Sequence, residues 1–236
     1  MKKLKLKAAY MGIILLTLTL TSLGSRAVAV FSESLSPDRE HCFVIDPGHG
    51  GIDGGATSCT RKLESAFNLE ISLRLRDLLH FMGYRTKMTR TEDISIYKKG
   101  DTIAQKKLSD LKERVRICNE TDGAILLSIH QNMFSDSKYF GPQVFFADSG
   151  ESKALADCLQ KSLDPQGKRG IKKAEGIYLM EHISCSGVLI ECGFLSNPQE
   201  EAKLRSAEYQ KELSCRIAAA SIKYLTDINK NVESNQ

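Results

Sequence analysis

Two histidines and two glutamates occupy positions from which they could act on one substrate. His49 lies in the turn-rich run Asp-Pro-Gly-His-Gly-Gly after the first apolar stretch, and His130 ends the apolar run Ala-Ile-Leu-Leu-Ser-Ile. Glu64 opens a helical pattern, and Glu191 follows Val-Leu-Ile. Two imidazoles and one carboxylate are a common ligand set for catalytic zinc, which keeps a fourth position for water. The second carboxylate could serve as general base, so the set predicts metal-assisted amide hydrolysis.

Glu191 is the candidate base because an unpaired carboxylate among apolar neighbours is costly to bury and requires a partner. The other histidines are weaker candidates. His182 follows a predicted strand and is the reserve ligand, whereas His80 is expected on a helix surface and His41 precedes the first strand.

The elements that must position these residues alternate between strands and helices. Strands are predicted over residues 42–46, 84–89, 123–130, 142–147, 176–181 and 187–192, and helices over 64–82, 108–119, 151–162 and 207–225, with a helix start at Asn197-Pro198 and an irregular polar segment over 91–107. This alternation predicts an α/β fold with a mostly parallel twisted sheet, flanked by helices on both faces, in a single domain. Ligands bind beyond the carboxyl ends of such strands, where His49, His130 and Glu191 are expected.

The N-terminal segment has the pattern of an export signal. Four lysines within residues 2–7 precede an uncharged apolar run over residues 8–23, and Ala27-Val28-Ala29 offers a cleavage site. Residues 1–29 are therefore predicted to be a signal peptide or an N-terminal membrane anchor, with membrane attachment through residues 8–23 in the second case. A linker over 30–41, a catalytic domain over 42–226 and a polar tail over 227–236 complete the expected organisation, and either alternative places the protein outside the cytoplasm.

Composition excludes several classes. With 42% hydrophobic and 26% charged residues the chain is expected to be globular. The net charge of +4 belongs to residues 1–29, because removing their five basic residues from 33 leaves 28 against 29 acidic ones. No nucleic-acid partner is expected, since the remaining bases are interleaved with acids. The seven cysteines contain no Cys-x-x-Cys pair, and most are predicted to be small buried apolar residues, with a disulfide left open.

Motifs of three other enzyme types are absent from the sequence. It contains no Gly-x-Ser-x-Gly elbow, no phosphate-binding Gly-x-x-x-x-Gly-Lys loop and no His-Glu-x-x-His helix motif. Serine hydrolases of the elbow type, nucleotide hydrolases and helix-motif zinc peptidases are therefore not favoured.

Six motifs in order carry a resemblance to a known family. They are residues 44–51 (Val-Ile-Asp-Pro-Gly-His-Gly-Gly), Leu63-Glu64 with Asn68-Leu69, Met88-Thr89-Arg90, Glu113-Arg114 with Asn119, residues 128–132 (Ser-Ile-His-Gln-Asn) and residues 188–197 (Val-Leu-Ile-Glu-Cys-Gly-Phe-Leu-Ser-Asn). From Cys42 to Leu225 the chain resembles the zinc-dependent N-acetylmuramoyl-L-alanine amidases of the amidase-3 family. The resemblance implies Zn²⁺ held by His49, Glu64 and His130, with Glu191 as the catalytic glutamate.

The resemblance also implies a substrate and a role. The substrate would be peptidoglycan, glycan strands with stem peptides, cut between N-acetylmuramic acid and L-alanine. As a short single-domain member with an export signal, the chain would act in spore-cortex formation, in the synthesis of muramic-δ-lactam. Targeting or activation is expected to come from the N-terminal segment or from a protein partner. Two alternatives stay open: a peptidoglycan-binding protein that has lost the chemistry, and a zinc peptidase that cuts within the stem peptide.

Overall fold

The computed structural model describes residues 40–233, with side chains described up to residue 230. The predicted signal or anchor lies outside the described residues. The strands are β1 (Cys42–Pro47), β2 (Arg85–Met88), β3 (Ala124–Asn132), β4 (Gln143–Phe146), β5 (Lys172–Lys173) and β6 (Ser186–Phe194). The helices are α2 (Glu64–Phe81), α3 (Ile103–Asn119), α4 (Gly150–Leu163), α5 (Tyr178–His182), α6 (Pro198–Arg205) and α7 (Ala207–Glu233). Within the described residues, none of these helices combines the length and apolar character that crossing a membrane requires.

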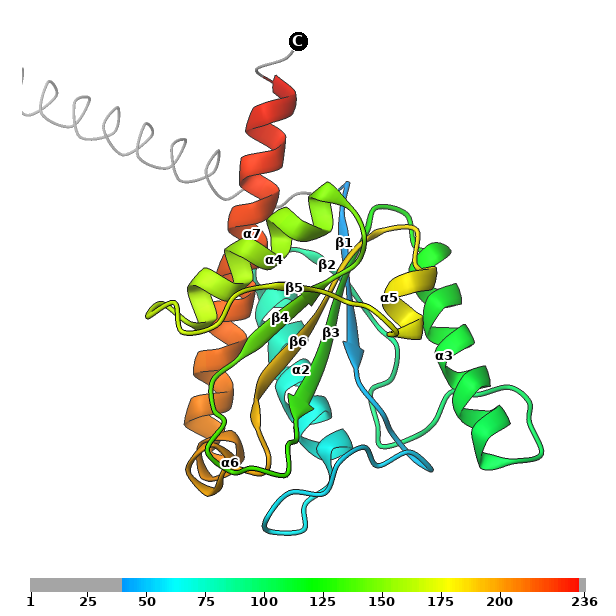
Figure 1. Cartoon of the computed structure of the whole chain (residues 1–236). Helices are drawn as coiled ribbons and strands as arrows, with labels where there is room; N and C mark the ends of the chain where they lie inside the picture. Colours follow the sequence, from blue (N-terminus) through cyan, green and yellow to red (C-terminus); the bar gives the residue numbers. More distant parts are fainter. Residues whose placement is uncertain (1–39, 234–236) are drawn as a thin grey trace, which may run out of the picture. The chain divides into compact units, whose positions relative to one another are not determined.

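The six strands form one sheet in the order β2-β1-β3-β6-β4-β5 (Figure 1). β1 pairs in parallel with β2 and β3, and β3 pairs in parallel with β6. Only the β4–β6 pair is antiparallel among the described strands. The predicted fold class, a mostly parallel sheet in an α/β domain, is confirmed, and its parallel centre aligns the carboxyl ends of β1, β3 and β6.

Helices cover both faces of the sheet, as the sequence predicts. Alternate residues of β1 face opposite ways, so Phe43 and Ile45 join the cluster packed by α2, α4 and α7, whereas Val44 joins a smaller cluster with α3 and α5. In Figure 1, α2 lies behind the strands, α4 and α7 lie on the left of the sheet, and α3 and α5 lie on its right. Burial on both faces explains why β1, β3 and β6 are continuous apolar runs rather than alternating ones.

The structure corrects three predicted elements. The predicted strand over 176–181 is instead the short helix α5, and the brief strand β5 lies just before it. α3 begins at Ile103 rather than at residue 108, because Thr102 and Gln105 form a capping box at its start. α7 continues to Glu233, beyond the predicted end at residue 225 and into the segment expected to be a polar tail.

The cysteines differ from the expectation that most are buried. All seven thiols are free, and only Cys42, Cys118 and Cys192 are buried, whereas Cys59 and Cys215 are exposed.

Candidate metal centre

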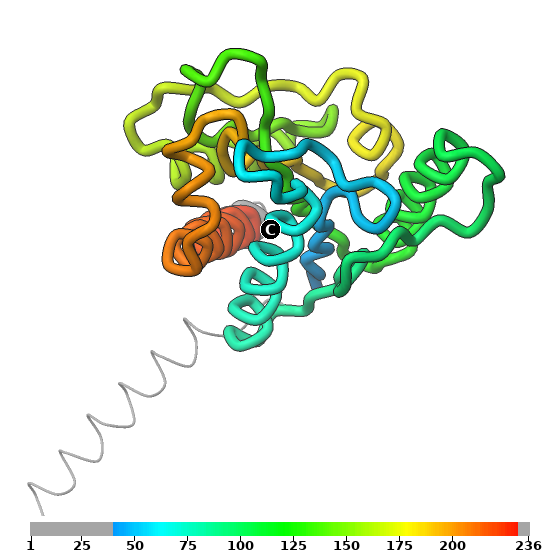
Figure 2. Tube along the Cα trace, turned by 90° about the horizontal axis from the view of Figure 1, so that it is seen from below, coloured from blue at the N-terminus to red at the C-terminus, as the bar shows by residue number. Residues whose placement is uncertain are grey.

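The candidate site lies at the carboxyl edge of the parallel strands. Figure 2 views the domain from below, and the blue-to-cyan segment that joins β1 to α2 crosses the edge that faces the viewer. His49 lies in this segment and Glu64 is the first residue of α2. His130 and Glu191 are register partners on β3 and β6, so they share one face of the sheet.

His49, Glu64 and His130 form the cluster, with one ligand atom of each within 4.8 Å of the others. The Nε2 atom of His49 lies 3.3 Å from Oε2 of Glu64, and the Nδ1 atom of His130 lies 3.1 Å from Oε1 of the same carboxylate. The two imidazole rings meet edge to face, 5.0 Å apart. The structure thus brings together the three residues that the sequence nominates as ligands.

Glu64 is fixed by its own hydrogen bonds. Its side chain is buried, and Oε2 accepts the backbone N–H of Ala56 at 2.9 Å while Oε1 accepts the backbone N–H of Gln131 at 3.2 Å. Asn68, one turn along α2, also donates to Oε1 at 3.3 Å. These bonds orient the carboxylate oxygens toward the two imidazoles.

The cluster concentrates charge. Burial alone would raise the pKa of Glu64, but hydrogen bonds from His130 and His49 hold it far below its usual range. Burial alone would lower the pKa of His49, yet Glu64 and Asp53 together raise it to about 9. An ionised carboxylate thus lies between the two imidazoles, a donor set to which a divalent cation binds by displacing protons from its ligand atoms.

Glu191 lies beside this cluster with an unsatisfied oxygen. Its Oε2 is buried and has no hydrogen-bond partner among the described residues. Burial raises the pKa of Glu191 to about 7, against the opposing effect of His130. An orphaned carboxylate oxygen is costly unless a further group, such as a reacting water, pairs with it.

Two buried arginines hold the backbone that carries His49. Arg114 of α3 donates to the carbonyl oxygens of Pro47 at 2.9 Å and His49 at 2.8 Å, and it forms an ion pair with Asp46 at 2.5 Å. Arg90 donates to Pro47 at 3.0 Å and to Gly48 at 2.9 Å. These bonds stabilise His49 in the left-handed region, at a φ of 61°, where a residue other than glycine is strained.

Glycine is required at two points where chain and side chains meet. A Cβ on Gly48 would lie 2.2 Å from Nε2 of His130, and a Cβ on Gly55 would lie 2.6 Å from Oε2 of Glu64. Gly55 also has a φ of 68°. Both positions therefore allow the ligand side chains to approach the β1–α2 segment closely.

A cavity of about 210 Å³ opens beside the cluster, on the α3 side of the sheet. His49 and His130 form part of its wall, and Leu179 and Leu189 supply apolar surface. Lys107 of α3 also lines the cavity. Two of the three residues of the cluster therefore border open space.

The remaining histidines lie elsewhere. His182, the reserve ligand, is exposed at the end of α5, stacks on Tyr178, and its Nδ1 donates to the Tyr178 carbonyl oxygen at 2.8 Å. His80 is exposed in the last turn of α2, as expected, and His41 precedes β1 at the opposite edge of the sheet. None of them joins the cluster within the described residues.

Sequence reasoning missed the residues that support the cluster. Arg90 and Arg114 appear within recognised motifs but received no role, because contacts across 42 and 65 residues leave no local pattern. Asp53 was also missed, although its Oδ2 lies 2.9 Å from Nδ1 of His49. A carboxylate four residues after a candidate histidine ligand was the available signal.

Comparisons with known proteins indicate the family of the chain. A family model described as N-acetylmuramoyl-L-alanine amidase matches residues 43–223. The germination-specific N-acetylmuramoyl-L-alanine amidase of Bacillus subtilis is 34% identical over 191 residues, 78% of this chain and 80% of that protein. The probable cell wall amidase LytH of Staphylococcus aureus is 29% identical, and the match covers 80% of this chain and 60% of LytH.

A solved structure shows the same relationship. The CwlD amidase from Clostridioides difficile, determined in complex with the GerS lipoprotein, superposes with a TM-score of 0.76 and 37% identity, over 79% of this chain and 98% of that one. The family predicted from the motifs is confirmed, and the chain is similar to amidases of the CwlD type. The chain belongs to the amidase-3 family of N-acetylmuramoyl-L-alanine amidases, enzymes that hydrolyse the amide between N-acetylmuramic acid and L-alanine in peptidoglycan.

Proposed function

We propose that this amidase is a zinc enzyme in which His49, Glu64 and His130 hold the metal and Glu191 is the catalytic glutamate. The observation that carries the proposal is the convergence of two imidazoles and a carboxylate within 4.8 Å, with both imidazoles at the wall of a cavity. Two nitrogen donors and one oxygen donor match the catalytic zinc sites that leave one position open. The fixed orientation of Glu64 adds support, because oriented ligands bind metal more tightly.

Zinc bound by these three residues would polarise the scissile carbonyl group and activate a water molecule for attack. The residues of the chain supply the proton transfers. Glu191 accepts a proton from the attacking water through its unpartnered Oε2, as the new C–O bond forms. It then donates that proton to the nitrogen of L-alanine as the C–N bond breaks, leaving a lactyl carboxylate and a free amino group.

The pKa of Glu191 suits both steps. Because burial raises it to about 7, the carboxyl group can accept and release a proton near neutral pH. A fully solvated carboxylate would be a weaker base. The apolar surroundings of Glu191 therefore favour the role of a proton shuttle rather than a structural role.

The biological role that we propose is removal of stem peptides during spore-cortex formation, the step that precedes muramic-δ-lactam closure. The germination-specific relative in Bacillus subtilis supports this role. The complex of the CwlD amidase with the GerS lipoprotein supports a protein partner for the present chain. Peptidoglycan as substrate supports an extracytoplasmic location, with residues 1–29 as export signal or anchor and residues 42–226 as the catalytic domain.

Zinc titration of the full-length protein tests the ligand assignment. Wild type should bind one zinc ion per chain, and His130→Ala should lose most of that affinity, because one of three protein ligands is removed. His182→Ala is the matched control, since this histidine is outside the cluster. Equal affinity of the wild type and the His130→Ala variant would refute the assignment.

A further inference from the structure

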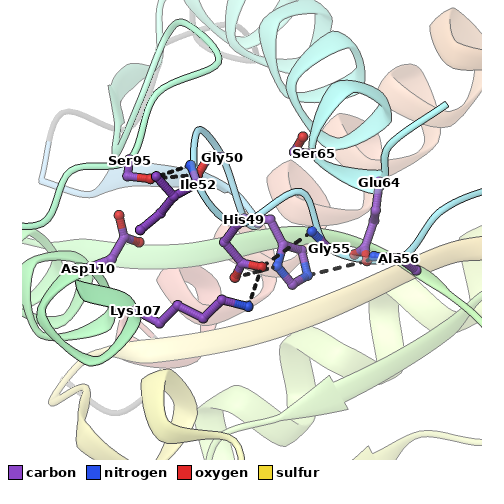
Figure 3. Close-up of polar contacts among 12 residues, drawn as sticks. His49, Gly50, Ile52, Gly55, Ala56, Glu64, Ser65, Ser95, Lys107 and Asp110 are labelled. Carbon is purple, nitrogen blue, oxygen red and sulfur yellow. Dashed lines mark hydrogen bonds and ion pairs between the residues drawn. The ribbon is translucent and has the colours of Figure 1, made fainter. Parts of the chain in front are cut away.

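Asp53 lies between a candidate metal ligand and helix α3. Its Oδ2 is 2.9 Å from Nδ1 of His49, and its Oδ1 accepts a hydrogen bond from the ammonium group of Lys107 at 2.7 Å. Figure 3 shows Lys107 approaching the loop from below and the imidazole of His49 turned toward Glu64. Asp53 thus links a lysine of α3 to the imidazole of His49.

The contact with Asp53 determines which nitrogen of His49 is available. An ionised carboxylate can only accept a hydrogen bond, so the contact with Asp53 requires the hydrogen on Nδ1, and Nε2 is the atom 3.3 Å from Glu64. Only Nε2 is free to bind a metal shared with Glu64 and His130. A rotation of the ring by half a turn about χ2 would place the carbon Cε1, instead of Nε2, toward the cluster and break the bond between Nδ1 and Asp53.

Asp53 is itself held in place. Its backbone N–H and carbonyl pair with Gly50, at 3.2 and 2.7 Å, which closes the loop after His49. The backbone N–H of Gly55 donates to Oδ1 at 3.4 Å, on the oxygen that also contacts Lys107. With both oxygens committed, the carboxylate has one orientation, and it can transmit that orientation to the imidazole.

Two simpler roles fit less well. A surface ion pair with Lys107 would not require the second oxygen to contact His49, and the Asp53 side chain is 27% exposed, so it is partly withdrawn from water. A role as fourth metal ligand is disfavoured because both oxygens already have partners. The cluster of candidate ligands among the described residues also excludes Asp53.

We propose that Asp53, anchored by Lys107 of α3, is a positioning residue that holds His49 with Nε2 directed at the metal position. This inference rests on the proposed function, because it assumes that His49 binds the metal. It gives α3, which supplies none of the three candidate ligands, a direct part in building the site. Carboxylates that accept the second N–H of a ligating histidine typically change metal affinity about 10- to 100-fold when removed.

Zinc affinity of full-length variants, measured by competition with a chromophoric chelator, tests the proposal. Asp53→Ala should weaken zinc binding by about 10- to 100-fold. Asp53→Asn keeps an oxygen acceptor for Nδ1 and should fall between this variant and wild type. Asp93→Ala is the matched control, because Asp93 accepts a hydrogen bond from Gly51 in the same loop without contacting His49. The proposal is overturned if the Asp53→Ala variant binds zinc with the same affinity as the Asp93→Ala variant.

Nuclear magnetic resonance gives a readout that a general loss of structure would not mimic. Histidine labelled with ¹⁵N should show a protected Nδ1 proton for His49 in the metal-free protein, assigned by its disappearance in His49→Ala. The proton should exchange rapidly in Asp53→Ala and stay protected in Asp93→Ala, while other imidazole signals are unchanged. If the proton is absent from wild type, the positioning role is wrong. If it is present but His49→Ala binds zinc normally, the metal assignment fails instead.

Discussion

Replacing Asp46 by asparagine should destabilise the protein because it removes the counterion of a buried arginine. Asp46 is 1% exposed and accepts hydrogen bonds from Thr89 at 2.6 Å and Ser128 at 2.7 Å, in addition to its ion pair with Arg114. Breaking a buried ion pair by removing one partner typically costs about 3–5 kcal/mol. Asp110 remains paired with Arg114 at 2.6 Å in the variant. We therefore expect Asp46→Asn to lower the free energy of unfolding by about 3 kcal/mol at neutral pH, the lower end of that range.

The pH dependence of unfolding provides an independent value for the contribution of Asp46 to the free energy of unfolding. Burial alone would raise the pKa of Asp46, but Arg114 and the two hydroxyl groups lower it to about 2. A shift from about 3.9 in the unfolded chain corresponds to about 2.6 kcal/mol. Because the folded-state pKa is depressed, this stability is fully present above pH ~4 to 5, falls to roughly half by pH ~3, and is lost as pH drops through the folded pKa.

Urea unfolding of full-length wild type and Asp46→Asn at pH 7 and pH 3 measures both effects. Other carboxylates titrate in both proteins, so the difference between them isolates Asp46. Asp148→Asn is the control, because Asp148 forms an exposed ion pair with Lys173 and should contribute less than about 1 kcal/mol. The reasoning is refuted if the free energy of unfolding of wild type exceeds that of Asp46→Asn by the same amount at both pH values. It is also refuted if Asp46→Asn destabilises the protein no more than Asp148→Asn does.

Three further predictions concern the site. Glu191→Gln should lower kcat by about 100-fold or more while zinc binding is retained, and equal kcat would argue against a proton shuttle. Gly48→Ala should weaken zinc binding because its Cβ would overlap the His130 ring, 2.2 Å from Nε2; unchanged affinity in a zinc titration would show that the ring can move away at little cost. Removal of metal with a chelator should abolish hydrolysis, and added zinc should restore it, as product release monitored over time would show.

The position of the site was predictable because it follows from topology. Parallel strands that are buried on both faces read as apolar runs, and the polar residues at their carboxyl ends must meet at one edge. His49 and His130 were found in this way, and Glu64 followed from its place at the start of the next helix. The structure brings these three together.

The supporting residues and one short element were not predictable by the same means. Arg114 reaches Asp46 across 68 residues, and only the packing of α3 against β1 and β3 creates that contact. The segment over 176–181 has a strand-like apolar pattern, but its residues Leu179 and Met180 are buried as one turn of helix against the smaller cluster. Short apolar runs are compatible with either element, so tertiary packing decides.

The central claim, zinc-dependent amide hydrolysis at the cluster of His49, Glu64 and His130, is tested most directly by its products. Full-length protein should be incubated with peptidoglycan, with zinc and with a chelator, and the released peptides identified by mass spectrometry. The account predicts zinc-dependent release of stem peptides that begin with a free L-alanine amino group. Peptides cut within the stem, or release that persists undiminished in the chelator, would contradict it.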